Sequence, residues 1–93
     1  MLKIFKIQGN SLYPYLKDGQ RVLCTNIFKL SKLKNDDIVI FSKTGYGVMI
    51  KQIKTINHDS CFVQGTDDFS IDSRDFGEIQ LDEIQYKLLF KLP

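Results

Sequence analysis

Six short runs along the chain either alternate apolar and polar residues or gather β-branched ones, and turn-forming residues bound each run. Such patterns are typical of β-strands. They predict strands at residues 2–8, 21–25, 37–41, 47–56, 60–65 and 84–92. Residues 26–34, NIFKLSKLK, deviate because their apolar side chains fall at near-helical spacing, which fits a helical turn or an irregular loop. With no linker or internal repeat, we expect a single small all-β domain over residues 1–93.

The composition gives no indication of a nucleic-acid-binding, zinc-binding or disulfide-rich protein. A chain of 93 residues can bury one modest core. Its 13 lysines and arginines against 11 aspartates and glutamates give a net charge of +2, which indicates no nucleic-acid partner. Cys24 and Cys61 have neither zinc-site nor disulfide-framework spacing. We therefore expect two buried free cysteines, no metal and no cofactor.

No stretch approaches the ~20 apolar residues of a transmembrane helix, and the first residues lack the pattern of a signal peptide. We expect a protein that does not span a membrane and is either cytoplasmic or peripheral to one. In residues 26–34, Lys29, Lys32 and Lys34 could face an anionic membrane surface. The alternative, which we favour, is a loop packed on the domain.

Ser11 is the first candidate for chemistry. It lies in GNSLYP, residues 9–14, where glycine and proline favour a turn straight after the first apolar run. A serine hydroxyl is a poor nucleophile near neutral pH unless a base takes its proton. The only histidine, His58, falls in the polar turn INHDS, which is typical of a solvated side chain. A Ser/His/Asp triad is therefore not predicted.

Lys51 is the candidate base. A lysine can take this role only when burial lowers its pKa from ~10.4. Alternation in GVMIKQIKTI, residues 47–56, places Lys51 between Met49 and Ile53 on an apolar face. An exposed strand lysine is the ordinary alternative.

Residues 65–77, GTDDFSIDSRDFG, form a third distinctive stretch between two glycines. A carboxylate beside an arginine makes a rigid charge-assisted pair, and a neighbouring serine can hydrogen-bond a neutral amine. The stretch could equally be an ordinary polar loop.

Taken in this order, the three stretches resemble the catalytic core of the type I signal peptidases, the serine/lysine proteases that remove secretory leader peptides. GNSLYPYLKDG is similar to the nucleophile box of that family, MIKQI to its general-base strand, and SIDSRDFG to its third box. KNDDIVIF and YKLLFKLP extend the resemblance over nearly the whole chain. It implies an all-β core of several coiled antiparallel sheets, a fold shared with the self-cleaving repressors of the LexA type.

By this resemblance Ser11 is the nucleophile and Lys51 the general base. Ser70 would hydrogen-bond and orient the Lys51 amine. The pair formed by Asp72 and Arg74 would brace the loop that holds Ser70.

The resemblance also assigns a nucleophile turn that includes Gly9, Asn10 and Pro14, in which the Ser11 N–H would be an oxyanion donor. Leu12 stands where the family usually has methionine, a volume-conserving change. Gly9 stands where some relatives carry a serine, so the oxyanion hole would consist of backbone groups.

The predicted function is a serine endopeptidase that removes a leader or pro-segment from a peptide or protein precursor through an acyl-enzyme. The resemblance implies small residues just before the scissile bond. The missing membrane anchor disfavours a membrane-embedded substrate. Because only eight residues precede Gly9, a repressor that cleaves its own N-terminal arm is also disfavoured. The alternative is a catalytically idle module of the same fold that binds an extended peptide.

Overall fold

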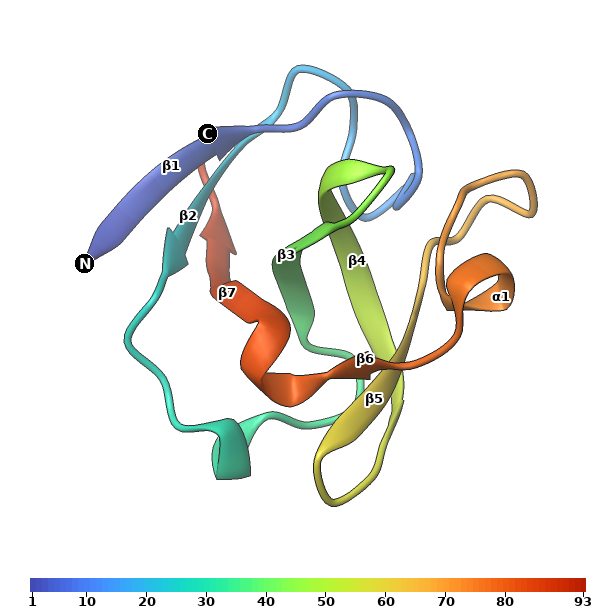
Figure 1. Ribbon diagram of the computed structural model, residues 1–93. Helices are drawn as coiled ribbons and strands as arrows, with labels where there is room; N and C mark the ends of the chain where they lie inside the picture. Colours follow the sequence, from blue (N-terminus) through green and yellow to red (C-terminus); the bar gives the residue numbers. More distant parts are fainter.

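The computed structural model describes residues 1–93 and contains seven strands in one hydrogen-bonded sheet (Figure 1). In chain order these are β1 (Leu2–Lys6), β2 (Arg21–Thr25), β3 (Ile38–Lys43), β4 (Gly47–Ile56), β5 (Ser60–Gln64), β6 (Ile79–Gln80) and β7 (Ile84–Lys91). Their order across the sheet is β1-β2-β7-β3-β4-β5-β6, and all neighbours are antiparallel. The all-β fold is confirmed, and the six predicted strands are present with ends that differ by at most two residues.

The strands form one continuous sheet, where the resemblance implied several. Register shifts interrupt the ladders of β2 with β7, of β3 with β7 and of β4 with β5. Bulges of this kind bend a strand and increase its twist. The single sheet can therefore coil around its own core, as Figure 1 shows.

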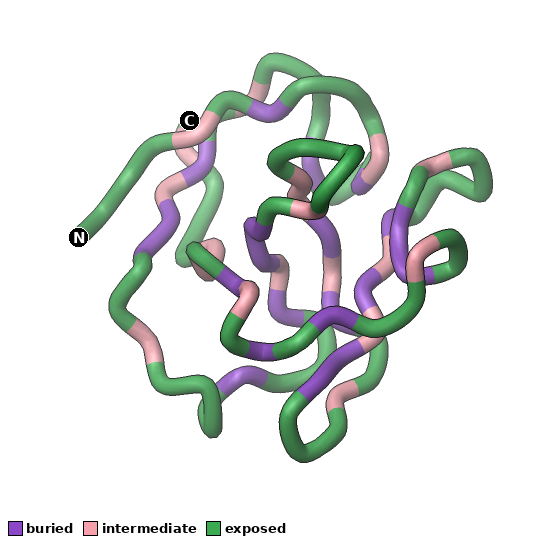
Figure 2. Tube along the Cα trace, viewed as in Figure 1, coloured by how far each residue is buried: buried purple, intermediate pink, exposed green.

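Strand β3 is the centre of the fold because it is buried on both faces. Val39 and Phe41 enter one hydrophobic cluster, whereas Ile40 between them enters the other. This explains the run of four consecutive apolar residues with which the strand begins, IVIF. The first cluster also contains Leu33, Ile53, Cys61, Val63, Ile79, Leu81 and Ile84, and the second contains Ile7, Leu12, Leu16, Val22 and Cys24. Buried segments run through the middle of the trace in Figure 2, while the hairpin tips are exposed.

Both cysteines lie inside these clusters as free thiols, so their predicted burial is confirmed. Burial raises the pKa of Cys24 to about 11, and it does the same for Cys61 with further contributions from Glu78 and Glu83. Neither thiol is therefore suited to act as a nucleophile near neutral pH.

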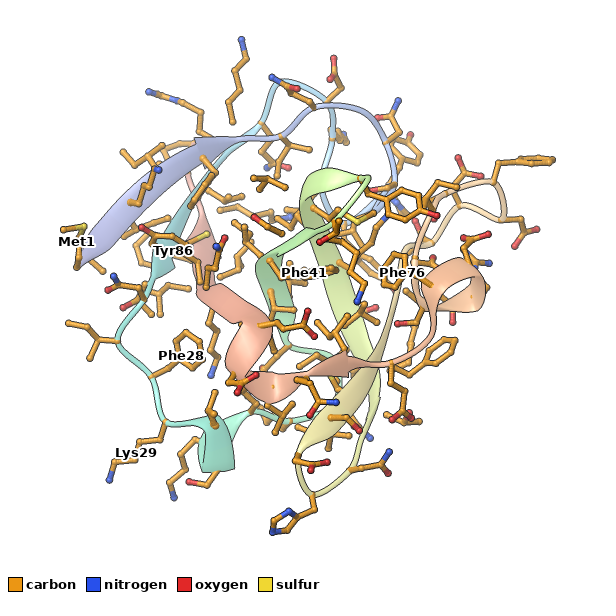
Figure 3. The ribbon with its side chains drawn as sticks, viewed as in Figure 1. Met1, Phe28, Lys29, Phe41, Phe76 and Tyr86 are labelled. Carbon is orange, nitrogen blue, oxygen red and sulfur yellow. The ribbon has the colours of Figure 1, made fainter.

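Residues 26–34 form a loop that contains one short 3-10 turn, Leu30–Lys32. Leu33 is buried and Phe28 packs against the first cluster, while Lys29 points away from the molecule (Figure 3). The favoured packed loop is thus confirmed for these apolar side chains, and contact with a membrane surface stays a prediction. Among the helical segments, none has the length and apolar character needed to cross a membrane.

Candidate active site

Ser11 lies in the loop that joins β1 to β2. The next residue, Leu12, is buried in the second cluster and anchors the loop to the core. Gly9, with a φ of 85° that favours glycine, donates its N–H to the Asp18 carboxylate at 2.7 Å. The Asp18 N–H in turn donates to the side-chain oxygen of Asn10 at 3.3 Å. These two bonds close the loop on itself and hold the segment that begins at Gly9.

The Ser11 side chain is half-buried, and its N–H donates to no acceptor in the chain. The turn around it is closed by the Tyr13 N–H, which donates to the Asn10 carbonyl at 3.1 Å. Pro14 follows as an exposed residue of the same turn. A free N–H on the nucleophile candidate is what an oxyanion donor requires, because it can bind charge that develops beside the hydroxyl.

Lys51 lies on β4 directly opposite Val39 of β3, and it is only 4% exposed. The predicted position between apolar neighbours is confirmed, because Ile53 is buried and Met49 packs against the same cluster. No carboxylate lies within ion-pair distance of the Lys51 amine. Burial lowers the pKa of Lys51, and this effect exceeds the opposing attraction of the Asp72 carboxylate.

Ser11 and Lys51 line the same open cavity of about 460 Å³. Eight of its twelve lining residues are hydrophobic, and the other four are Ser11, Lys51, Lys6 and Gln8, so the hydroxyl and the amine lie in a mostly apolar hollow. The hydrophobic side chains come from β1, from the hairpin formed by β3 and β4, and from the segment after β5. They include Phe5, Ile40, Met49, Ile50 and Ile71. The cavity can accept apolar side chains of a bound peptide next to the hydroxyl and the amine.

The third stretch contains the expected pair of Asp72 and Arg74. The guanidinium donates to both carboxylate oxygens, at 2.9 and 2.7 Å, and the Arg74 N–H adds a third bond at 3.0 Å. Asp72 is 0% exposed, and it also caps the short helix α1 (Ser73–Phe76). Burial by itself would raise the pKa of Asp72, but hydrogen bonds from Arg74 and from the Gly65 N–H hold it at about 2. The carboxylate is therefore charged and fully partnered.

Ser70 is placed in this network and not on the lysine. Its hydroxyl has the Asp67 carbonyl at 2.9 Å and the Asp72 carboxylate at 3.2 Å as acceptors, and it accepts from Arg74 at 3.2 Å. No hydrogen bond joins Ser70 to Lys51, so the contact that the resemblance implied is not made in this structure. The carbonyl and the charged pair bind the hydroxyl instead. Catalytic hydrogen bonds often tighten only in the substrate complex, so the role itself stays a prediction.

Two neighbouring residues, Gly65 and Thr66, were not predicted as parts of the site. Thr66 donates its N–H to the Ser11 carbonyl at 2.6 Å, across 55 positions of sequence. The only local signal for this contact was a glycine at the end of a strand pattern, which often marks a close backbone approach.

Neither a catalytic histidine nor a metal site is found beside Ser11. His58 is exposed in the turn between β4 and β5, as predicted, and it does not line the cavity of Ser11. No group of three or more histidine, cysteine, aspartate and glutamate side chains is arranged to hold a metal ion. Ser11 supplies a hydroxyl and Lys51 an amine to the cavity, beside the polar groups of Lys6, Gln8 and Tyr46.

Comparison with known proteins identifies one matching family, over most of the chain. A family model described as Peptidase S24-like matches residues 1–85, which include Ser11, Lys51 and the third stretch. A comparison with curated proteins gave no match. The family supports a peptidase in general and the all-β fold, whereas the closer resemblance to type I signal peptidases is a prediction that this match does not address. The chain belongs to the Peptidase S24-like family.

Proposed function

We propose that the protein is a serine endopeptidase in which Ser11 is the nucleophile and Lys51 the general base. The observation that carries the proposal is the buried amine. Lys51 has no carboxylate partner, its pKa is lowered by burial, and it shares an apolar cavity with a serine whose N–H is free. A lysine in such surroundings can supply a neutral amine at a pH where an exposed lysine is charged.

The proposed reaction starts when the neutral Lys51 amine takes the proton of the Ser11 hydroxyl while Oγ attacks the carbonyl carbon of the scissile bond. The Ser11 N–H stabilises the oxyanion of the tetrahedral intermediate. When the intermediate collapses, the C–N bond breaks and the leaving amine takes the proton from the Lys51 ammonium. Water then attacks the acyl-enzyme with Lys51 again as the base, which releases the carboxylate product and restores the Ser11 hydroxyl.

The proposed substrate is a peptide or protein precursor that loses a leader or pro-segment. The apolar cavity supports an extended peptide with apolar side chains beside the scissile bond. Small residues just before that bond are what the resemblance to signal peptidases implies. Ser70, the Asp72–Arg74 pair and the turn residues Gly9, Asn10 and Pro14 would position the two reacting groups.

A serine-reactive fluorophosphonate tests the mechanism without a known substrate. We expect intact-mass spectrometry to find one adduct on the parent protein, with peptide mapping at Ser11. Ser11→Ala should remain unlabelled, while Ser31→Ala, which changes an exposed serine in the 3-10 turn, should react like the parent. A parent protein that reacts no faster than Ser11→Ala would contradict the proposal.

The second candidate is a catalytically idle module that binds an extended peptide. It is favoured by one observation, namely that no hydrogen bond joins Lys51 to Ser11 or to Ser70. Incubation with a proteome-derived peptide library separates the two candidates. New peptide termini that appear with the parent and not with Ser11→Ala support the peptidase, whereas retention of uncut peptides supports the idle module.

A further inference from the structure

We propose that Thr66 is a positioning residue for the nucleophile, a role that rests on the proposed function of Ser11. Thr66 is an exposed residue that follows β5. In Figure 1 the segment after β5 comes close to the loop between β1 and β2. Gly65 and Thr66 lie where these two loops meet.

Thr66 binds the nucleophile turn through two groups. Its N–H donates to the Ser11 carbonyl at 2.6 Å. Its hydroxyl donates to the Tyr13 carbonyl and lies 3.3 Å from the Ser11 carbonyl. The two carbonyls at either end of the segment Ser11–Tyr13 are thus held by one residue.

Gly65 allows this approach. A Cβ at position 65 would lie 2.5 Å from the Ser11 carbonyl oxygen and 2.6 Å from the Ser70 hydroxyl, closer than real Cβ contacts. The Gly65 N–H also donates to the Asp72 carboxylate at 2.9 Å. An unbroken series of contacts therefore runs from the charged Asp72–Arg74 pair through Gly65 and Thr66 to the backbone of Ser11.

The contact with Thr66 holds the backbone of Ser11 itself, whereas the other bonds of the loop join its neighbours Gly9, Asn10 and Tyr13 to the rest of the turn. Ser11 belongs to no helix or strand, and its own N–H must stay free for the oxyanion. The buried side chain of Leu12 holds the turn from the core side, and Thr66 holds the Ser11 carbonyl from the other side. A displacement of about 1 Å in a reacting group can cost about a hundredfold in rate. Loss of the Thr66 hydroxyl, which leaves the N–H bond in place, should cost less, about tenfold.

The test compares Thr66→Val with Thr66→Ser, using the rate of fluorophosphonate labelling at Ser11 between pH 6 and 10. Valine keeps the branched shape and removes the hydroxyl, whereas serine keeps the hydroxyl. We expect Thr66→Val to lower the labelling rate about tenfold at every pH without moving the midpoint of the pH profile. Thr66→Ser should stay within about twofold of the parent. Thr55→Val, an exposed threonine of β4 away from the cavity, should leave the rate unchanged.

Several outcomes would overturn the role. A parental rate for Thr66→Val, an equal loss in Thr66→Val and Thr66→Ser, or a shifted pH midpoint would each exclude positioning by the hydroxyl. A fall in melting temperature without a fall in rate would show a purely structural contact. If the parent itself labels no faster than Ser11→Ala, the proposed function fails and the positioning role with it. An unaffected Thr66→Val beside a reactive parent overturns the positioning role alone.

Discussion

Two lysines flank Val39 in the sheet and have opposite surroundings. Lys51 on β4 and Lys87 on β7 each lie opposite Val39 in the strand register. The side chain of Lys87 is 24% exposed, and its amine lies 3.5 Å from the Asp37 carboxylate. Lys51 is nearly fully buried and has no carboxylate within ion-pair distance. Two lysines opposite the same residue, one in the β3–β4 ladder and one in the β3–β7 ladder, thus differ in that only one of the amines has a carboxylate partner.

Lys87 has a carboxylate partner and Lys51 has none because the two nearby carboxylates, Asp37 and Asp72, bind different cations. Asp37 binds two lysines, Lys34 at 2.9 Å and Lys87 at 3.5 Å. Asp72, whose charge alone would raise the pKa of Lys51, is bound by the guanidinium of Arg74. Arg74 therefore acts on Lys51 in two ways, by its own positive charge and by neutralising Asp72. The Asp72 carboxylate thus already has a stronger partner than Lys51, and burial remains the main influence on the pKa of the amine.

The largest effect should come from replacing the unpartnered lysine. Lys51→Met keeps the length and apolar contacts of the side chain but removes the base. We expect labelling of Ser11 to fall by about a hundredfold or more, because general-base catalysis contributes factors of this size. The melting temperature should rise, since an unpaired buried amine is replaced by an apolar group. Lys54→Met, at an exposed position of the same strand, is the matched control and should leave the rate unchanged. Labelling of Lys51→Met at the parental rate would exclude Lys51 as the base.

The next effect concerns Asp72 and stability at low pH. Its pKa is lowered from 3.8 to about 2 on folding, so its contribution is present above pH 3.8 and is lost as the pH falls toward 2. This shift corresponds to about 2 kcal/mol of unfolding free energy. Urea unfolding at pH 5 and pH 2 should show that loss in the parent, in addition to losses from other carboxylates, and not in Asp72→Asn. Asp68→Asn, at a carboxylate that is 95% exposed near the same arginine, should keep the parental pH dependence. An equal dependence in the parent and in Asp72→Asn would contradict the assigned pKa.

A third experiment tests whether Arg74 keeps Lys51 unpartnered. In Arg74→Gln the Asp72 carboxylate loses its guanidinium partner and can attract the Lys51 proton, so the pKa of Lys51 should rise. The midpoint of the labelling profile should move to higher pH by about one unit, with a rate about tenfold lower at neutral pH. An unchanged midpoint with a uniformly lower rate would show instead that Arg74 only holds the loop. Measuring the pKa of Lys51 directly by NMR, assigned with Lys51→Met, gives the same answer without labelling.

Local patterns predicted most of the fold and the candidate base. Alternation located β4 and the buried face of Lys51, because period-two geometry is a property of the strand itself. β6 was missed because it has only two residues and forms through pairing with β5, which leaves no periodic signal. Helix α1 was also missed, although Asp72 and Asp75 form a capping box whose three-residue spacing can be read in the sequence.

The contacts between loops could not be predicted from the same patterns. Thr66 and Ser11 are 55 positions apart, and their hydrogen bonds depend on how the sheet coils. The resemblance to signal peptidases suggested the pair of Asp72 and Arg74, which the structure contains. It also suggested a bond from Ser70 to Lys51, which is absent because the hydroxyl is bound by Asp67, Asp72 and Arg74. Local residue types thus identified the participants, while competition among acceptors decided the hydrogen bonds.

The smallest effect should come from replacing Lys87, the lysine that has a carboxylate partner. This variant is also a control for Lys51→Met. Lys87→Met removes a partly exposed ion pair with Asp37, while Lys34 remains bound to the same carboxylate at 2.9 Å. Pairs of this kind contribute about 0–1 kcal/mol and are weakened by salt. We expect a fall of at most about 1 kcal/mol in the free energy of unfolding, reduced further in high salt, and an unchanged rate of labelling at Ser11. If Lys87→Met slowed labelling as much as Lys51→Met does, burial without a partner would not be what distinguishes the two amines.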